Sequence, residues 1–166
     1  MMKRNYTRTQ FLDKIRRVRA LRPDISLSSD FIIGFPSETE DDFQQTMDLI
    51  DEAGCDFAYS FLYSPRPGTP AANLRDNVPL EDKQRRLQTL QARIRELDEA
   101  YKQRLVGSTQ KVLVERASTR GQGQVAGRTS SNRMVNFDGT LQMVGQMVDV
   151  FITEVQPNSL RGRLLS

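Results

Sequence analysis

The sequence contains no histidine and a single cysteine, Cys55. Histidine is the commonest general base and metal ligand, and iron–sulfur clusters are held by several thiolates, so the chain alone offers neither a serine–histidine triad, nor a usual zinc site, nor a cluster ligand set. An internal disulfide is also excluded. We interpret Cys55, at the start of an apolar run, as a buried and inert thiol.

Long apolar runs are also absent. No stretch of 18 or more apolar residues occurs, and the basic N-terminus MMKRNYTRTQ leads into an amphipathic segment. Neither a membrane span nor a signal peptide is predicted, and we expect a cytoplasmic protein. With 166 residues, 37% hydrophobic and 27% charged, the chain has the composition of one ordinary globular domain or two small ones.

Charge is unevenly distributed along the chain. Residues 1–103 carry 16 Lys and Arg against 17 Asp and Glu, whereas residues 104–166 carry 8 against 4, a balance of +4. The C-terminal third is therefore the natural candidate for a polyanion partner such as nucleic acid.

The first hundred residues alternate between helical and strand patterns, which is typical of an α/β fold with parallel strands. The patterns predict a helix over residues 9–21, a strand within 25–35, a helix that begins at Ser37 or Thr39 and ends at Gly54, and a strand within 55–64. Two strands leave unpaired edges and an uncovered apolar surface. We expect the strands that would complete this sheet to lie on the N-terminal side.

A long helix is predicted over residues 80–105 and is ended by Gly107. After it the sequence changes to short alternating runs of apolar and polar residues. Five short strands are then predicted, within residues 110–115, 124–129, 133–137, 147–155 and 160–165, with a flexible hairpin loop over 118–124. Such a series indicates a small antiparallel barrel of the kind that binds oligonucleotides. We place the domain boundary between residues 104 and 105.

Residues at the ends of the two expected α/β strands are candidate ligand contacts. Asp30 lies on the first strand, which closes on Gly34 and leads into a helix N-terminus, where α/β folds collect ligands. Arg66 follows the second strand in a proline-stiffened loop and could clamp a carboxylate or phosphate. Equally, Gly34 and Pro36 could only shape a turn, and Arg66 could be a solvated charge.

The predicted barrel carries residue types suited to RNA. Arginines can meet phosphates, amides can read base edges and an exposed aromatic can stack on a base, which suits single-stranded or loop RNA. The candidates are Arg128, Asn132, Arg133, Asn136 and Phe137, together with Arg161 and Arg163, which alternate with apolar residues and should share one strand face. The alternative is that Phe137 and Val135 are core and the arginines only coat a surface.

Five stretches, in chain order, resemble the radical S-adenosylmethionine (SAM) methylthiotransferases: MKRNYTR, SSDFIIGFPSETEDDF, YSFLYSPRPGTPAA, GRTSSNRMVNFDG and VFITEVQPNSLRGRL. The resemblance covers nearly the whole chain. The last two stretches are most similar to the TRAM domain of the branch that modifies dimethylallyladenosine beside the tRNA anticodon. The branch that acts on a ribosomal protein has a different TRAM sequence, and the threonylcarbamoyladenosine branch shares YSPRPGTPA but differs later.

The resemblance implies an enzyme of three parts: an N-terminal domain with three cluster-binding cysteines, a radical SAM core with a CxxxCxxC loop, and TRAM. This chain would then be the C-terminal portion of a radical SAM partial (β/α) barrel, residues 1–104, followed by a small all-β, OB-like TRAM barrel, residues 105–166. The full-length enzyme would use SAM, two [4Fe-4S] clusters and an electron donor. Neither cysteine set is present in this chain, so no metal ligand or catalytic residue is assigned here.

Carried over by motif, the resemblance assigns SAM contacts to Gly34, Phe35 and Glu38, with Asp30 on the same strand and Arg66 at the barrel mouth. It assigns contact with the tRNA anticodon stem-loop to the stretch that holds Arg128, Asn132, Arg133, Asn136 and Phe137. The family usually has glycine where this sequence has Ser37, a change expected to tighten the turn without abolishing it.

Three interpretations follow. The first is a C-terminal fragment of a tRNA methylthiotransferase, without activity by itself, from either the dimethylallyladenosine branch or its threonylcarbamoyladenosine sister. The second is a stand-alone RNA-binding module, and the third is a globular α/β and β-barrel protein with no nucleic-acid role. The motifs favour the first, and its uncovered strands predict that the isolated chain associates in solution.

Overall fold

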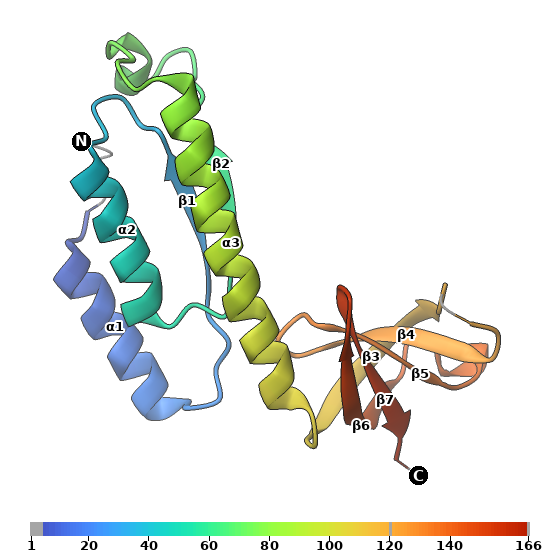
Figure 1. Ribbon diagram of the computed structural model, residues 1–166. Helices are drawn as coiled ribbons and strands as arrows, with labels where there is room; N and C mark the ends of the chain where they lie inside the picture. The colour runs from blue at the N-terminus through green and yellow to red at the C-terminus, as the bar shows by residue number, and fades with distance from the viewer. Residues whose placement is uncertain (1–4, 120, 166) are drawn as a thin grey trace. The chain divides into compact units, whose positions relative to one another are not determined.

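The computed structural model describes residues 5–119 and 121–165, which form two compact units, Met1–Asp98 and Glu99–Ser166 (Figure 1). Residues 1–4 of the basic N-terminus, and Arg120 in the expected hairpin loop, lie outside the described residues. The long helix α3 (Leu80–Leu105) begins in the first unit and ends in the second. No helix in the described ranges has both the length and the apolar character needed to cross a membrane.

The first unit has the predicted α/β order. It contains α1 (Arg8–Leu21), β1 (Ser28–Ile33), α2 (Glu40–Ala53), β2 (Phe57–Leu62) and the start of α3, with a short 3-10 turn η1 (Pro70–Asn73) that the sequence patterns did not indicate. The two strands are parallel, as expected, with Ser28 opposite Phe57 and Ile33 opposite Leu62. Both strands are shorter than the apolar runs from which they were predicted.

Local signals define the ends of α2. Thr39, rather than Ser37, is the N-cap: its hydroxyl accepts from the Asp42 N–H, and the Asp42 carboxylate accepts from the Thr39 N–H. Gly54 ends the helix in the left-handed conformation, φ 60°. A matching capping box at Thr7 and Gln10 begins α1.

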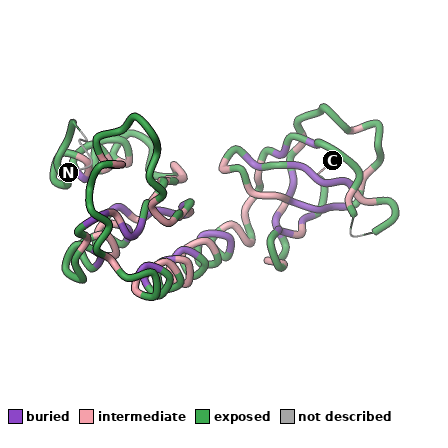
Figure 2. Tube along the Cα trace, turned by 90° about the horizontal axis from the view of Figure 1, so that it is seen from above, coloured by how far each residue is buried: buried purple, intermediate pink, exposed green. Residues whose placement is uncertain are grey.

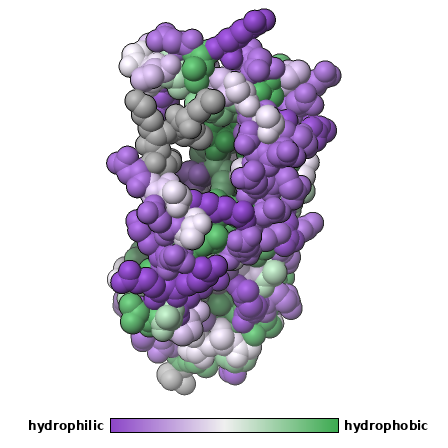
Figure 3. All heavy atoms as spheres, turned by 90° about the vertical axis from the view of Figure 1, so that its left-hand side faces the viewer, coloured by the Kyte–Doolittle hydropathy of each residue, from purple (hydrophilic) through white to green (hydrophobic). Residues whose placement is uncertain are grey.

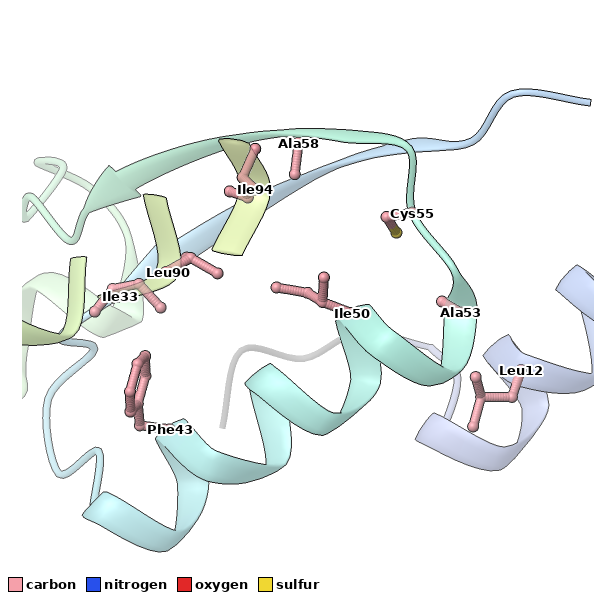
Figure 4. Close-up of a cluster of buried hydrophobic side chains, with 9 residues drawn as sticks. All are labelled: Leu12, Ile33, Phe43, Ile50, Ala53, Cys55, Ala58, Leu90 and Ile94. Atoms are coloured by element: carbon pink, nitrogen blue, oxygen red, sulfur yellow. The ribbon is translucent and has the colours of Figure 1, made fainter. Parts of the chain in front are cut away.

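The helices cover one face of the two-stranded sheet. Figure 4 shows the core they form, with Ile33 and Ala58 from the strands facing Ile50 of α2 and Leu90 of α3. The opposite face is bare within the described residues: Ile32, Tyr59 and Phe61 are 39%, 53% and 55% exposed. This unit therefore has a packed side and an open apolar side.

The second unit is a closed barrel in which every strand has two neighbours (Figure 1). Its strands are β3 (Thr109–Ala117), β4 (Gln124–Thr129), β5 (Met134–Asp138), β6 (Met147–Gln156) and β7 (Ser159–Leu164), with a turn η2 (Leu141–Met143) after β5. The order around the barrel is β3-β4-β5-β7-β6. The expectation of an antiparallel barrel needs one correction, because β5 and β7 pair in parallel. A closed ring with an odd number of strands cannot alternate direction throughout.

Apolar residues from all five strands fill the barrel. Figure 2 shows the buried segments running along the strands, and Phe137 and Leu160 are fully buried. Leu105 and Val106, where α3 ends, pack against this core. A Cβ atom at Gly127 would lie 2.3 Å from the Leu113 carbonyl oxygen, so only glycine permits this close approach.

Candidate functional site

The loop after β1 is held by side chains of α3. Gly34 has φ +74°, and a Cβ atom placed on it would lie 2.5 Å from Cγ of Lys83, whose stem packs against the glycine. Lys83 is buried and forms an ion pair with Asp76. Gly34 is thus needed both for its left-handed backbone and for the close packing of α3.

Glu38 ties this loop together. One carboxylate oxygen accepts from the Gly34 N–H at 3.1 Å, and the other accepts from the Arg86 guanidinium at 3.0 Å. Arg86 also donates to the Glu38 carbonyl oxygen and to Glu40. The Arg86 and Glu38 side chains are 6% and 10% exposed, so this ion pair is largely shielded from solvent. Because both carboxylate oxygens bind protein groups, Glu38 positions the loop rather than presenting its charge to a ligand.

The loops after β1 and β2 meet. The rings of Phe35 and Tyr63 contact edge to face, with centroids 5.1 Å apart, and the Tyr63 N–H donates to the Ile33 carbonyl oxygen at 2.8 Å. Gly34, Phe35 and Glu38 are therefore brought together at one end of the sheet. Asp30 lies on β1 itself, exposed and opposite Tyr59, on the bare face.

Arg66 lies in the turn that follows β2. Its carbonyl oxygen accepts from the N–H and the hydroxyl of Thr69, whereas its side chain is exposed and makes no ion pair or hydrogen bond to the residues described. The Thr69 N–H and hydroxyl hold the backbone of this turn, whereas no ion pair or hydrogen bond within the described residues orients the Arg66 guanidinium.

A hollow of about 490 Å³ lies along β1, between α1 and α2. Both faces of the strand line it, through Ser29, Asp30, Phe31 and Ile32, which places it at the edge of β1 that has no partner strand in the described residues. Figure 3 shows hydrophobic atoms at the bottom of a hollow that is bordered by hydrophilic residues. The free edge of the sheet is thus recessed and partly apolar.

The hairpin between β4 and β5 is a rigid turn built around Asn132. Asn132 has φ +62°, which asparagine tolerates, and its N–H donates to the Thr129 carbonyl oxygen at 2.9 Å. The Arg128 guanidinium donates to Oδ1 of Asn132 at 3.0 Å and forms an ion pair with Glu115. Arg128 is held in place but exposed, as an arginine that binds phosphate needs to be.

Arg133, at the end of the same turn, packs against the end of α3. Its guanidinium carbon lies 4.9 Å from the ring centroid of Tyr101, and that of Arg104 lies 5.2 Å from the same centroid. Tyr101 and Arg104 were missed in the sequence. The only signal was their spacing of three residues on a helix, which is equally common in solvated faces.

Two of the candidate RNA contacts are buried. Phe137 is 0% exposed in the barrel core, and Asn136 is 5% exposed, with Oδ1 accepting from the Ser118 hydroxyl at 2.8 Å. Neither side chain reaches the surface, so stacking by Phe137 and base reading by Asn136 have no geometric support. For Phe137 and Val135 the alternative of core residues holds.

Arg161 and Arg163 lie on the outer face of β7, as their spacing predicts. Arg161 donates to Asp138 at 2.8 Å, and the Arg163 guanidinium lies 5.0 Å from the Phe151 ring centroid. The intervening Gly162 faces inward, with its backbone against Val150. Both arginines are anchored at the surface by neighbouring strands.

Cys55 is 5% exposed, and burial raises the pKa of its thiol, with the charge of Asp56 acting in the same direction. The inert interpretation of this thiol is supported, since a raised pKa disfavours thiolate. Among the residues described, no group of three His, Cys, Asp or Glu side chains is arranged to hold a metal. An iron–sulfur cluster therefore does not fit this part of the chain.

Comparison with known proteins gives two findings. Residues 103–165 match the TRAM domain, which covers the barrel and the last turn of α3. Over 165 residues, 99% of this chain, the sequence is 54% identical to a tRNA-2-methylthio-N(6)-dimethylallyladenosine synthase of Legionella pneumophila (strain Corby) and 53% identical to that of Cronobacter sakazakii (strain ATCC BAA-894). It is 52% identical over its full length to the enzyme of Hydrogenovibrio crunogenus. The chain spans 37%, 35% and 35% of the lengths of these relatives.

Proposed function

We propose that this chain is the C-terminal part of a tRNA-2-methylthio-N(6)-dimethylallyladenosine synthase. It contains a TRAM domain, and it is related to such enzymes over nearly its whole length. The enzyme would add a 2-methylthio group to dimethylallyladenosine next to the anticodon by radical SAM chemistry. The observation that carries the proposal is identity of 54% across both units, not only across the barrel.

In this proposal the barrel binds the tRNA anticodon stem-loop. Its support is the exposed, preorganised Arg128 on the Asn132 turn, with Arg133 beside it and Arg161 and Arg163 on another strand. Guanidinium groups held by neighbours lose less conformational freedom when they bind phosphate. Asn132 acts as a positioning residue, because its side-chain oxygen orients Arg128.

The first unit would supply part of the SAM pocket. Its bare face carries Asp30, Tyr59 and Phe61, and the loop with Gly34 and Phe35 follows β1 at one end of the sheet. This arrangement fits a nucleoside, because aromatic rings and one carboxylate offer stacking and a hydrogen-bond acceptor. SAM would supply the radical and the methyl group. The residues of this chain would orient it, with Glu38 and Arg86 holding the loop.

The remainder of the polypeptide would provide the other sheet strands and the cluster ligands, and it is the partner that the open edge of β1 requires. The single buried Cys55 cannot replace two cluster ligand sets. The isolated chain would therefore bind RNA without modifying it. We place the full-length enzyme in the cytoplasm, with an external electron donor.

Nucleoside analysis of tRNA tests this proposal. Disruption of the locus that encodes this chain should abolish 2-methylthio-dimethylallyladenosine and leave dimethylallyladenosine in its place, and the purified 166-residue chain with SAM and reductant should form no product. Unchanged nucleosides after disruption would contradict the proposal. Loss of the methylthio group from threonylcarbamoyladenosine instead would favour the sister activity.

A further inference from the structure

The end of α3 and the β4–β5 turn present two guanidinium groups to one aromatic ring. The guanidinium carbons of Arg104 and Arg133 lie 5.2 and 4.9 Å from the centroid of Tyr101, so they are no more than about 10 Å apart. That separation is comparable to the Debye length of about 8–10 Å at physiological salt. A phosphate bound at one guanidinium group can therefore lie within about one Debye length of the other.

The ring that holds them is fixed. Tyr101 is 8% exposed, and the helix end just beyond it is anchored to the barrel by Leu105 and Val106 and by a hydrogen bond of 2.9 Å from the Gly107 N–H to the Ile152 carbonyl oxygen. On the other side, the Arg133 N–H donates to the Thr129 hydroxyl at 3.1 Å. The backbone segments from which both arginines extend are thus held in place by hydrogen bonds and packing.

Stacking does not prevent these arginines from binding phosphate. A cation–π contact uses the face of the guanidinium, whereas phosphate oxygens are bound by the N–H groups at its edge. Stacking also reduces the rotamer freedom that each side chain would lose on binding. Arg128 lies on the same hairpin and extends the positive surface.

We propose that the last turn of α3 belongs to the RNA-binding surface, with Tyr101 positioning Arg104 and Arg133 as a pair that binds phosphates of the RNA backbone. The inference rests on the proposed RNA binding by the barrel and extends the interface beyond its strands. Arg104 is the contact that it adds, and Tyr101 is a positioning residue that does not itself touch RNA.

Salt-dependent binding of the full 166-residue chain to a labelled anticodon stem-loop RNA tests the inference. Each phosphate contact contributes about 0.7 to the slope of log affinity against log salt for single-stranded RNA. Arg104→Ala should reduce the slope by about that amount and weaken binding about fivefold at 0.1 M salt. Arg95→Ala, which removes the same charge from an exposed position of α3, should leave both unchanged.

Two variants at Tyr101 separate positioning from folding. Tyr101→Phe keeps the ring and should bind like the unmodified chain, whereas Tyr101→Leu removes it and should reduce the slope, with thermal melting confirming that each variant is folded. If the chain binds RNA and Arg128→Ala weakens it, but Arg104→Ala behaves like Arg95→Ala, the inference is overturned while the proposed function stands. If the unmodified chain shows no salt-dependent binding, the proposed RNA-binding role fails and the inference fails with it.

Discussion

The two units of this chain differ in whether the edges of their strands are paired. In the barrel, each strand pairs with two neighbours, and all five strands contribute buried apolar side chains to one closed core. In the first unit, β1 pairs only with β2 among the described residues, and the face that carries Ile32, Tyr59 and Phe61 is uncovered. A closed barrel pairs every strand edge within itself, whereas this two-stranded sheet depends on the helices that cover one of its faces and leaves the edge of β1 and the other face without a partner among the described residues.

Under the proposed function, this difference between the units explains how one part of a larger enzyme would contain a complete RNA-binding part. The barrel unit carries its own core and its own basic surface, so the proposed RNA binding would need no segment outside that unit. In the same proposal, the first unit would carry only part of a pocket, and its bare face would be the surface that the remaining strands cover.

Replacement of apolar residues should affect the two units very differently. Phe137→Ala, at a site that is 0% exposed, should lower the free energy of unfolding by about 3–5 kcal/mol through loss of contacts and a residual cavity. Phe61→Ala, at a site that is 55% exposed, should change it by no more than about 0.5 kcal/mol. Urea denaturation followed by circular dichroism measures both. A decrease in the free energy of unfolding for Phe61→Ala as large as that for Phe137→Ala would mean that the bare face is covered in solution.

The buried ion pair at the strand-end loop should dominate the stability of the first unit. Arg86→Ala leaves the Glu38 carboxylate largely buried without its cation. We expect the free energy of unfolding to fall by about 3 kcal/mol, which is the lower end of the range for breaking a buried ion pair, because the Gly34 N–H still donates to the carboxylate. The neighbouring Arg85 is 53% exposed and pairs with exposed Glu40, so Arg85→Ala should cost less than about 1 kcal/mol. Urea unfolding of both variants gives the comparison, and similar losses would refute the positioning role.

Acid should loosen α2 before the barrel. Hydrogen bonds from the Thr39 N–H, then its hydroxyl, hold the pKa of Asp42 below the usual 3.8. A carboxylate whose pKa is lowered by folding stabilises the native state above its unfolded pKa and loses that effect as pH falls through the folded value. Protection of the amides in the first turn of α2, measured as the exchange rate relative to the intrinsic rate at the same pH, should therefore decrease below about pH 4. Asp42→Asn, which retains an acceptor, should remove this pH dependence; an unchanged profile would contradict the assignment.

Backbone strain should give the smallest effect. Ser37 has φ +72°, a conformation that costs a residue with a Cβ atom about 1–2 kcal/mol, while glycine loses about 0.5–1 kcal/mol more entropy on folding. Ser37→Gly should therefore stabilise the first unit by about 0.5 kcal/mol. In the barrel, Asn132 and Asn158 have φ in the same region, which asparagine tolerates, so Asn158→Gly should leave the stability nearly unchanged. Thermal melting of both variants measures the two effects. A loss on Ser37→Gly would show that the serine side chain has a role of its own.

Features encoded locally were predictable from the sequence. The bounds of α3 agree with its apolar periodicity and with Gly107, and α2 ends at Gly54 as expected. The first turn of α2 was ambiguous because Ser37 and Thr39 are both good caps. The reciprocal hydrogen bonds with Asp42 decide for Thr39, and an aspartate three residues after Thr39 was the available signal.

Features that depend on distant contacts were not predictable. The parallel pairing of β5 with β7 follows from closure of the barrel, which no single strand encodes. Phe137 was considered as an exposed aromatic, although its spacing of two from Val135 already placed both on one strand face, and burial makes that face the core. The stacking of Arg133 on Tyr101 joins residues 32 positions apart, beyond any local pattern.

The central claim is that the barrel unit is the complete RNA-binding part. The most direct test compares the affinity of residues 99–166 for an anticodon stem-loop RNA with that of the intact 166-residue chain across a range of salt concentrations. We expect a folded monomer whose affinity and salt slope match those of the intact chain within about twofold, because every proposed phosphate contact lies in that unit. A folded barrel that binds at least tenfold more weakly, or without salt dependence, would contradict the account and assign RNA recognition to the first unit.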